Sequence, residues 1–394
     1  MKNYKLTFFG ACLCFFLQAL VINIYPFFFT AFKKLYDISL QKLTYLTFII
    51  FAVQFSIDAF GYKLADKLGY RKSLFLCNAS IFLGFTSIGI LIKLINPFIA
   101  IIISIVLSSF GGGIIETISS PMVEALPFEN KSAKMSLLHS FYCWGHLFTI
   151  LFSTLLRLII PTEKWYLCLL IWAFLPILNT LVFIKAPIEE LQATEELCSS
   201  KSLFKQKTYI FMLFALLFAG AVEQGLAQWI SYFAENTLKM DKTKGDLTAT
   251  CIFALCMALS RTFYGVKGGK LNLGRTLIIC SLCAFAGLIC IALEIKWLSV
   301  VGIVLAGLAI GILWPGILSF TTSSGVNGGT KMFSFFALAG DAGCLLGPML
   351  IGFIASSSSF KVGISVNSLS GLFIAMLVLL AIKNSMKNKK ITLN

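Results

Sequence analysis

Residues 61–72 read Gly-Tyr-Lys-Leu-Ala-Asp-Lys-Leu-Gly-Tyr-Arg-Lys and join two long apolar runs, 43–63 and 73–93. Each run is about 20 residues long, which is the length of an α-helix that crosses the hydrocarbon core of a bilayer. The segment between the runs is short and basic, so the two helices turn back on each other at one membrane face. This stretch therefore predicts a helical hairpin of a membrane protein.

The composition extends this prediction to the whole chain. Of the 394 residues, 58% are hydrophobic and 12% are charged, whereas a soluble domain carries about 25% charged residues. A water-soluble fold is therefore excluded. Twelve membrane spans are predicted, at residues 7–30, 43–63, 73–93, 97–122, 135–159, 165–185, 209–233, 246–266, 276–293, 297–320, 332–355 and 363–383.

The longest polar segment, 186–207, divides these spans into two sets of six. We predict an all-α membrane protein with an N-terminal six-helix bundle (1–185), a cytoplasmic linker (186–207) and a C-terminal six-helix bundle (208–394). Lys134-Met135 and Lys331-Met332 open equivalent helices of the two halves, which indicates an internal duplication.

The formal net charge of +15 indicates membrane topology rather than nucleic-acid binding. No basic stretch is interleaved with aromatic residues outside the apolar runs. With the N-terminus in the cytoplasm, Lys and Arg are more numerous on cytoplasmic segments than on outer ones. We therefore expect a monomeric, multi-pass protein of a bacterial inner membrane, with both termini cytoplasmic.

The segment 61–72 also resembles the signature loop of the major facilitator superfamily, Gly-x-Leu-Ala-Asp-Arg-x-Gly-x-Arg-Lys. Gly61 lies one position early, and Tyr62 takes the place of the first glycine. The resemblance implies two six-helix bundles, a binding site between them near the membrane midplane, and alternating access. It also implies gating roles for residues of the loop. Five residues match the pattern in register: Asp66, Lys67, Gly69, Arg71 and Lys72.

Within the superfamily, three segments resemble the sugar:proton symporters that include the fucose permease. They are Gly111 to Thr117 followed by Pro121, Leu137 to Phe141, and Val222-Glu223. That group has an aspartate four residues before a proline in its first helix. Ile22 occupies this place here and Asn23 is the nearest polar residue, so the full proton-coupling pair does not carry over.

Ionisable residues within the predicted spans are candidates for function, because they are costly in a bilayer and mark substrate or proton paths. The candidates for proton coupling are Glu116, Glu223, His139 and His146. A salt bridge from Glu116 to Arg261 is the alternative for Glu116. The candidates for gating within the spans are Asp58, Arg261 and Asp341.

The predicted span 135–159 holds both histidines of the chain. His139 and His146 lie about 20° apart on one helix face, with Tyr142 near the same stripe. Such a polar stripe is typical of the wall of a wet cavity, and histidine titrates close to physiological pH. The alternative is that each imidazole only hydrogen-bonds a neighbouring helix.

The predicted span 209–233 carries Gln224 and Gln228 one turn apart, with Trp229 beside them. Carboxamides pair with hydroxyl groups and an indole packs on the apolar face of a sugar, so this cluster predicts substrate contacts. Polar contacts between helices are the alternative. The full set of candidate substrate-binding residues is Asn23, Gln54, Tyr142, Gln224, Gln228, Trp229 and Trp314.

Enzyme motifs are absent from the sequence: no phosphate-binding loop, paired metal-ligand spacing or nucleophile elbow is found. We therefore expect no enzyme activity, cofactor or metal. The expected function is proton-coupled import of a small polar solute, with Na⁺ as the other possible ion. Drug or metabolite efflux by proton antiport is the alternative, although the span 135–159 lacks the Gly-Pro motif usual in antiporters. A non-transporting membrane sensor is the third class.

Overall fold

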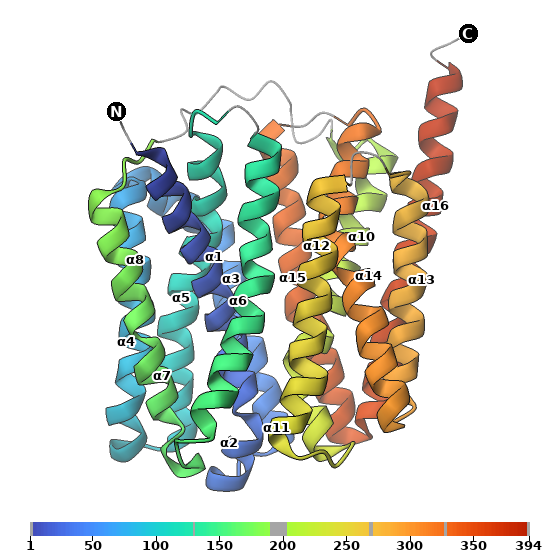
Figure 1. Ribbon diagram of the computed structural model, residues 1–394. Coiled ribbons are helices and arrows are strands. Elements are labelled where there is room, and N and C mark those ends of the chain that lie inside the picture. The colour runs from blue at the N-terminus through green and yellow to red at the C-terminus, as the bar shows by residue number, and fades with distance from the viewer. Residues whose placement is uncertain (1–2, 129–130, 190–202, 268–270, 327–328, 392–394) are drawn as a thin grey trace. The chain divides into compact units, whose positions relative to one another are not determined.

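The computed structural model describes residues 3–128, 131–189, 203–267, 271–326 and 329–391. Side chains are not described for residues 61–66, 131–133, 136, 329–331, 333 and 386–391. Every regular element in the described ranges is a helix (Figure 1). The elements before the linker are α1 (Tyr4–Phe27), α2 (Phe29–Tyr36), α3 (Leu40–Leu68), α4 (Tyr70–Leu94), α5 (Pro97–Glu124), α6 (Lys131–Arg157), η1 (Thr162–Lys164), α7 (Tyr166–Trp172) and α8 (Phe174–Lys185).

The elements after the linker begin with a long helix and a short π-helical segment. In order they are α10 (Lys207–Asn236), α11 (Lys242–Gly245), η2 (Asp246–Cys251, π-helical), α12 (Ile252–Lys267), α13 (Leu273–Ala292), α14 (Lys296–Ser323), α15 (Gly329–Ser357) and α16 (Phe360–Ile391).

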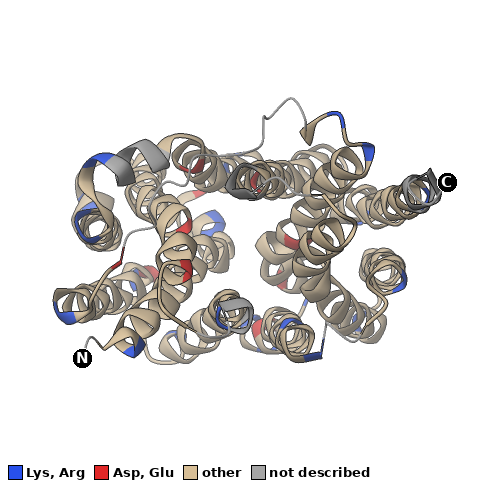
Figure 2. Ribbon diagram, turned by 90° about the horizontal axis from the view of Figure 1, so that it is seen from above, with Lys and Arg blue, Asp and Glu red and all other residues tan. Residues whose placement is uncertain are grey.

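Eleven helices in the described ranges are long and apolar enough to cross a membrane. The remaining predicted span, 135–159, corresponds to α6, which is 27 residues long and so has sufficient length. Polar residues, including both histidines, lower its hydropathy. The predicted all-α membrane fold is confirmed. Viewed along the helix axes, the ribbon is mostly uncharged, with few acidic or basic segments (Figure 2).

The chain forms two compact units. Unit 1 contains residues 1–192 and 228–254, and unit 2 contains residues 193–227 and 255–394. The division into bundles at residues 185 and 208 stays a prediction. The second half of α10 packs with the first unit, so α10 contributes residues to both units.

The helix α1 is the central helix of unit 1. In its apolar window 78% of residues are buried, against 39% for α3 and for α4. It packs against α5, α6 and α8. A polar side chain on α1 therefore faces protein far more often than lipid.

In unit 2, α13 packs against α14 and α16, and α15 packs against α16. The first half of α10 approaches α15 through small residues, with Gly220 lying against Gly340. This packing places the polar residues of α10 and α12 among other helices.

The connection between α3 and α4 is a single residue, Gly69, whose φ is +78°. Glycine adopts this backbone conformation without the Cβ clash that other residues meet. The predicted tight turn is therefore present, although α3 continues to Leu68, beyond the predicted end at residue 63. Lys67 is exposed beside the turn. Asp66 lies outside the described side chains, and its gating role stays a prediction.

Arg71 joins the start of α4 to the end of α8. Its guanidinium donates to the carbonyl oxygens of Phe183 and Ala186, the latter at 2.8 Å from Nη2. The last carbonyls of a helix lack partners within the helix, so an arginine there satisfies them. The start of the linker is held at the same place, because Tyr4 donates to Glu189 at 2.8 Å.

We expect Arg71→Ala to lower the free energy of unfolding by about 1.5–3 kcal/mol, the usual contribution of a hydrogen bond to a charged group. Arg71→Lys should recover only part of this loss, because an ammonium lacks the planar fork that reaches two carbonyls. Thermal unfolding of the purified protein measures the effect. Lys72→Ala is the matched control, since Lys72 is exposed one residue away. An equal loss in both variants would show that the contacts of Arg71 are not specific.

Candidate functional site

The acidic residue at the centre of unit 1 is Glu116 on α5, which is partly buried. The Nε2 amide of Gln18, on α1, donates to Oε2 of Glu116. Gln18 is only 3% exposed, so this carboxylate has a protein partner shielded from solvent. Sequence reasoning missed Gln18; a lone glutamine within the apolar run 7–30 was the available signal.

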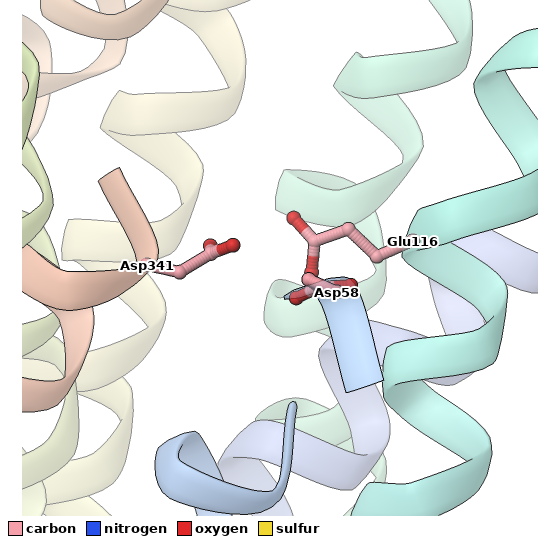
Figure 3. A group of neighbouring side chains, drawn as sticks. All are labelled: Asp58, Glu116 and Asp341. Carbon is pink, nitrogen blue, oxygen red and sulfur yellow. The ribbon is translucent and has the colours of Figure 1, made fainter. Parts of the chain in front are cut away.

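A second carboxylate lies beside Glu116. A carboxylate oxygen of Asp58, on α3, is within 4.8 Å of one from Glu116 (Figure 3). Thr117 donates to Oδ1 of Asp58 at 3.3 Å. The candidate gating residue Asp58 is thus a neighbour of the candidate proton carrier.

The stretch of α5 before Glu116 packs against both α1 and α3. A Cβ at Gly112 would lie 2.8 Å from Nε2 of Gln54, on α3, and 3.5 Å from a methyl of Val21, on α1. Glycine at this position leaves the room that the Gln54 carboxamide occupies. Gln54 lies one turn before Asp58, and Gly112 lies one turn before Glu116. Gln54 thus lies one turn from the level at which Asp58, Glu116 and Gln18 meet. We refer to these four residues, which come from three helices of unit 1, as the polar ladder.

The two histidines of α6 have different surroundings. His139 is exposed and lies at the edge of the Phe15 ring, with Nε2 at 3.5 Å from the Ser120 hydroxyl. His146 is 1% exposed, and its Nε2 has no hydrogen-bond partner among the described residues. The centroid of its ring lies 6.4 Å from the centroid of the Phe253 ring, in an edge-to-face arrangement. The two histidines of the predicted stripe therefore differ in burial, since one is exposed and the other is enclosed by protein.

The candidate residues of α10 itself are buried. Gln228 is 1% exposed and donates to the carbonyl of Ile22 at 3.4 Å. Trp229 packs against Phe29 with ring centroids 5.4 Å apart. Gln224 is 4% exposed, whereas Tyr142 on α6 is partly exposed. Asn23 donates to the carbonyl of Ala19 in its own helix at 2.8 Å.

In unit 2, Arg261 on α12 pairs with Glu223 on α10. The nitrogen-to-oxygen distance is 3.1 Å, and the side chains are 11% and 7% exposed. Arg261 also donates from Nε to the carbonyl of Gly311 at 3.3 Å. Glu223 is therefore a salt-bridge partner of Arg261 within unit 2. The alternative pairing of Arg261 with Glu116, which belongs to unit 1, stays a prediction.

Two further candidates lie on neighbouring helices of unit 2. Trp314 of α14 packs against Gly340 of α15. Asp341 follows Gly340 and is 9% exposed (Figure 3). The substrate role of Trp314 and the gating role of Asp341 stay predictions.

A second buried ion pair lies at the end of unit 1 opposite the N-terminus (Figure 1). Lys242 pairs with Asp246 at 2.9 Å, and Ser231 donates to the same carboxylate at 2.7 Å. Sequence reasoning did not single out this network, although an acid and a base four residues apart were its signal. Nearby, Lys34 of α2 pairs with Glu235 of α10 at 2.9 Å.

Ion pairs and carboxylates inside apolar helices are typical of membrane proteins that move polar solutes or ions. The comparisons with known proteins agree with that class. The family model described as Major Facilitator Superfamily matches residues 8–330, so the chain belongs to this superfamily. It is a multi-pass membrane protein and a secondary transporter, not an enzyme. No curated protein sequence matches the chain.

Solved structures of the same fold cover almost the whole chain. The E. coli fucose:proton symporter FucP is 16% identical, with a TM-score of 0.68 over 96% of this chain and 99% of that one. A bacterial homologue of the human lysosomal transporter Spinster is 14% identical, with a TM-score of 0.76 over 98% of each chain. The nucleoside transporter NupG is 14% identical, with a TM-score of 0.72 over 95% of this chain and 99% of that one. At these identities the likeness shows a shared fold.

Proposed function

We propose that this transporter imports a small polar solute, a sugar or related metabolite, by proton symport with alternating access. The observation that carries the proposal is the polar ladder of unit 1, where Glu116 lies beside Asp58 and accepts a hydrogen bond from Gln18. A carboxylate pair within apolar helices has the chemistry of a proton carrier. A fucose:proton symporter and a nucleoside transporter share the fold, which supports a polar, hydroxylated solute.

Two experiments test this function. A thermal-shift screen of the purified protein against L-fucose, other sugars, nucleosides and drugs identifies the solute, because a ligand that binds only the folded state stabilises it. Uptake into proteoliposomes with an imposed pH gradient then tests the coupling. Accumulation driven by an inward proton gradient supports symport. Accumulation driven only by the opposite gradient would indicate the efflux antiporter, and dependence on Na⁺ alone would exclude proton coupling.

We propose that Gln228 is a residue of α10 that contacts the substrate. Removing a hydrogen-bonding partner from a desolvated site costs about 1–3 kcal/mol, so Gln228→Ala should weaken solute binding by roughly 5- to 150-fold. Gln206→Ala is the control, since Gln206 precedes the same helix. Equilibrium binding in detergent measures the effect. Unchanged affinity in Gln228→Ala, with wild-type stability, would assign this face of α10 a structural role.

The proposed topology has both termini in the cytoplasm of a bacterial inner membrane, in a monomeric protein. The excess of Lys and Arg on the segments assigned to the cytoplasm supports it. Labelling of a cysteine introduced at Lys67, which is exposed at the turn between α3 and α4, tests the orientation. An impermeant reagent should react in inside-out vesicles and leave intact cells unlabelled.

A further inference from the structure

Only one of the two polar atoms of the Gln18 carboxamide has a hydrogen-bond partner among the described residues. Its Nε2 donates to Glu116, whereas its Oε1 has no hydrogen-bond partner among the described residues. The side chain is 3% exposed, in the helix most enclosed by protein in unit 1. A buried acceptor without a partner lowers stability, so a role in function would explain its presence beside a carboxylate.

The chemistry of the neighbouring acid provides such a role. An ionised carboxylate only accepts hydrogen bonds, whereas a protonated carboxyl group also carries one O–H donor. The first state needs an N–H partner, and the second needs an oxygen acceptor. The two ends of a carboxamide are nearly equal in size, so a half-turn about its last bond exchanges them at the same place. Gln18 therefore holds a suitable partner for either protonation state of Glu116.

We infer that Gln18 is the positioning residue of the proton site. It donates from Nε2 to Glu116 in the ionised state and accepts at Oε1 from the carboxyl O–H in the protonated state. The inference rests on the proposed role of Glu116 as proton carrier. Because Gln18 belongs to α1, which packs against α5, α6 and α8, it links the protonation of α5 to the central helix of unit 1.

Within unit 1, titratable side chains of α3 and α6 also lie near this stretch of α5. Asp58 of α3 is within 4.8 Å of Glu116 and accepts from Thr117. His139 of α6 lies at the Ser120 hydroxyl, one turn beyond Glu116. At Gly111, α4 presents the backbone carbonyl oxygen of Cys77, whose thiol donates to the carbonyl of Leu74 in its own helix. An ionised carboxylate only accepts, and a neutral imidazole holds its donor and its acceptor on different sides of the ring, whereas a carboxamide presents both at the end of one side chain.

Gln54 is a matched control for Gln18. It is a second buried glutamine, 4% exposed, on the same ladder. Its carboxamide lies at Gly112, one turn from Glu116, and its Nε2 has no hydrogen-bond partner in the described part of the chain. The two glutamines share size and burial, and they differ in contact with Glu116. A signal that follows Gln18 and not Gln54 therefore reports that contact.

Infrared difference spectroscopy of the purified protein in lipid, between alkaline and acid buffer, tests the inference without a transported solute. We expect acidification of the wild type to add a carboxyl C=O band that is lost in Glu116→Gln. A shift of a glutamine carboxamide band should accompany it. The carboxamide shift should be lost in Gln18→Leu and kept in Gln54→Leu. Gln18→Met, which keeps an unbranched side chain, gives a second variant if Gln18→Leu does not fold.

Two results would overturn the inference in different ways. A carboxamide shift that persists in Gln18→Met or Gln18→Leu, or that is absent from a wild type showing the Glu116 band, would rule out the positioning role while keeping Glu116 as the proton carrier. A carboxyl band that persists in Glu116→Gln would instead show that another group takes the proton. That outcome overturns the proposed role of Glu116, and the role of Gln18 with it.

Discussion

We expect the Glu116→Gln variant to lose proton-driven accumulation of solute, whereas exchange of labelled for unlabelled solute across the membrane should continue. A carboxamide is permanently neutral and nearly isosteric with a protonated carboxyl group, so it mimics a carrier that never releases its proton. Exchange needs only the loaded carrier to reorient, and net symport needs deprotonation. The contact with Gln18 can survive, because two carboxamides pair donor to acceptor.

Proteoliposome assays of accumulation and of counterflow, with the solute identified by thermal shift, measure the two activities separately. Asp37→Asn is the matched control, because Asp37 is an acidic residue at the end of α2, away from the polar ladder. Retention of proton-driven accumulation in Glu116→Gln would remove Glu116 from the coupling mechanism. Loss of counterflow together with accumulation would indicate a structural role.

The second large effect concerns the buried pair in unit 2. Glu223→Gln and Arg261→Met should each lower the free energy of unfolding by about 3–5 kcal/mol, because each leaves one charge buried without its partner. The double variant should be more stable than either single variant, since replacing both charges removes the uncompensated one. The pair is well shielded, at 3.1 Å and with side chains 11% and 7% exposed.

Thermal unfolding in detergent of the wild type, the two single variants and the double variant gives the coupling between the residues. The ion pair Lys34 and Glu235 is the control, because Lys34 is 66% exposed and an exposed pair contributes about 0–1 kcal/mol. Additive losses at Glu223 and Arg261 would show that the two side chains do not act as a pair. Stability close to wild type in Arg261→Met would show that other groups compensate the Glu223 carboxylate.

The sequence by itself determined the membrane class and the helix positions. Length and hydropathy are local properties, so runs such as 43–63 and 73–93 locate helices without knowledge of their neighbours. The turn at Gly69 was also local, because a positive φ favours glycine at the single residue that joins the two helices. The candidate residues Glu116, Glu223 and Arg261 were found for a similar reason, since charges inside apolar runs stand out.

Only the tertiary structure decided which of these residues meet. Glu116 is paired with Gln18, 98 residues earlier in the chain, and Arg261 with Glu223. Asp58 lies beside Glu116, a position that the gating interpretation did not anticipate. Lipid tails are as apolar as Leu or Ile, so a membrane helix needs no polar stripe to mark the face that points outward. Helix periodicity therefore carries little information about rotation, and the partners of a buried charge are set by packing between helices.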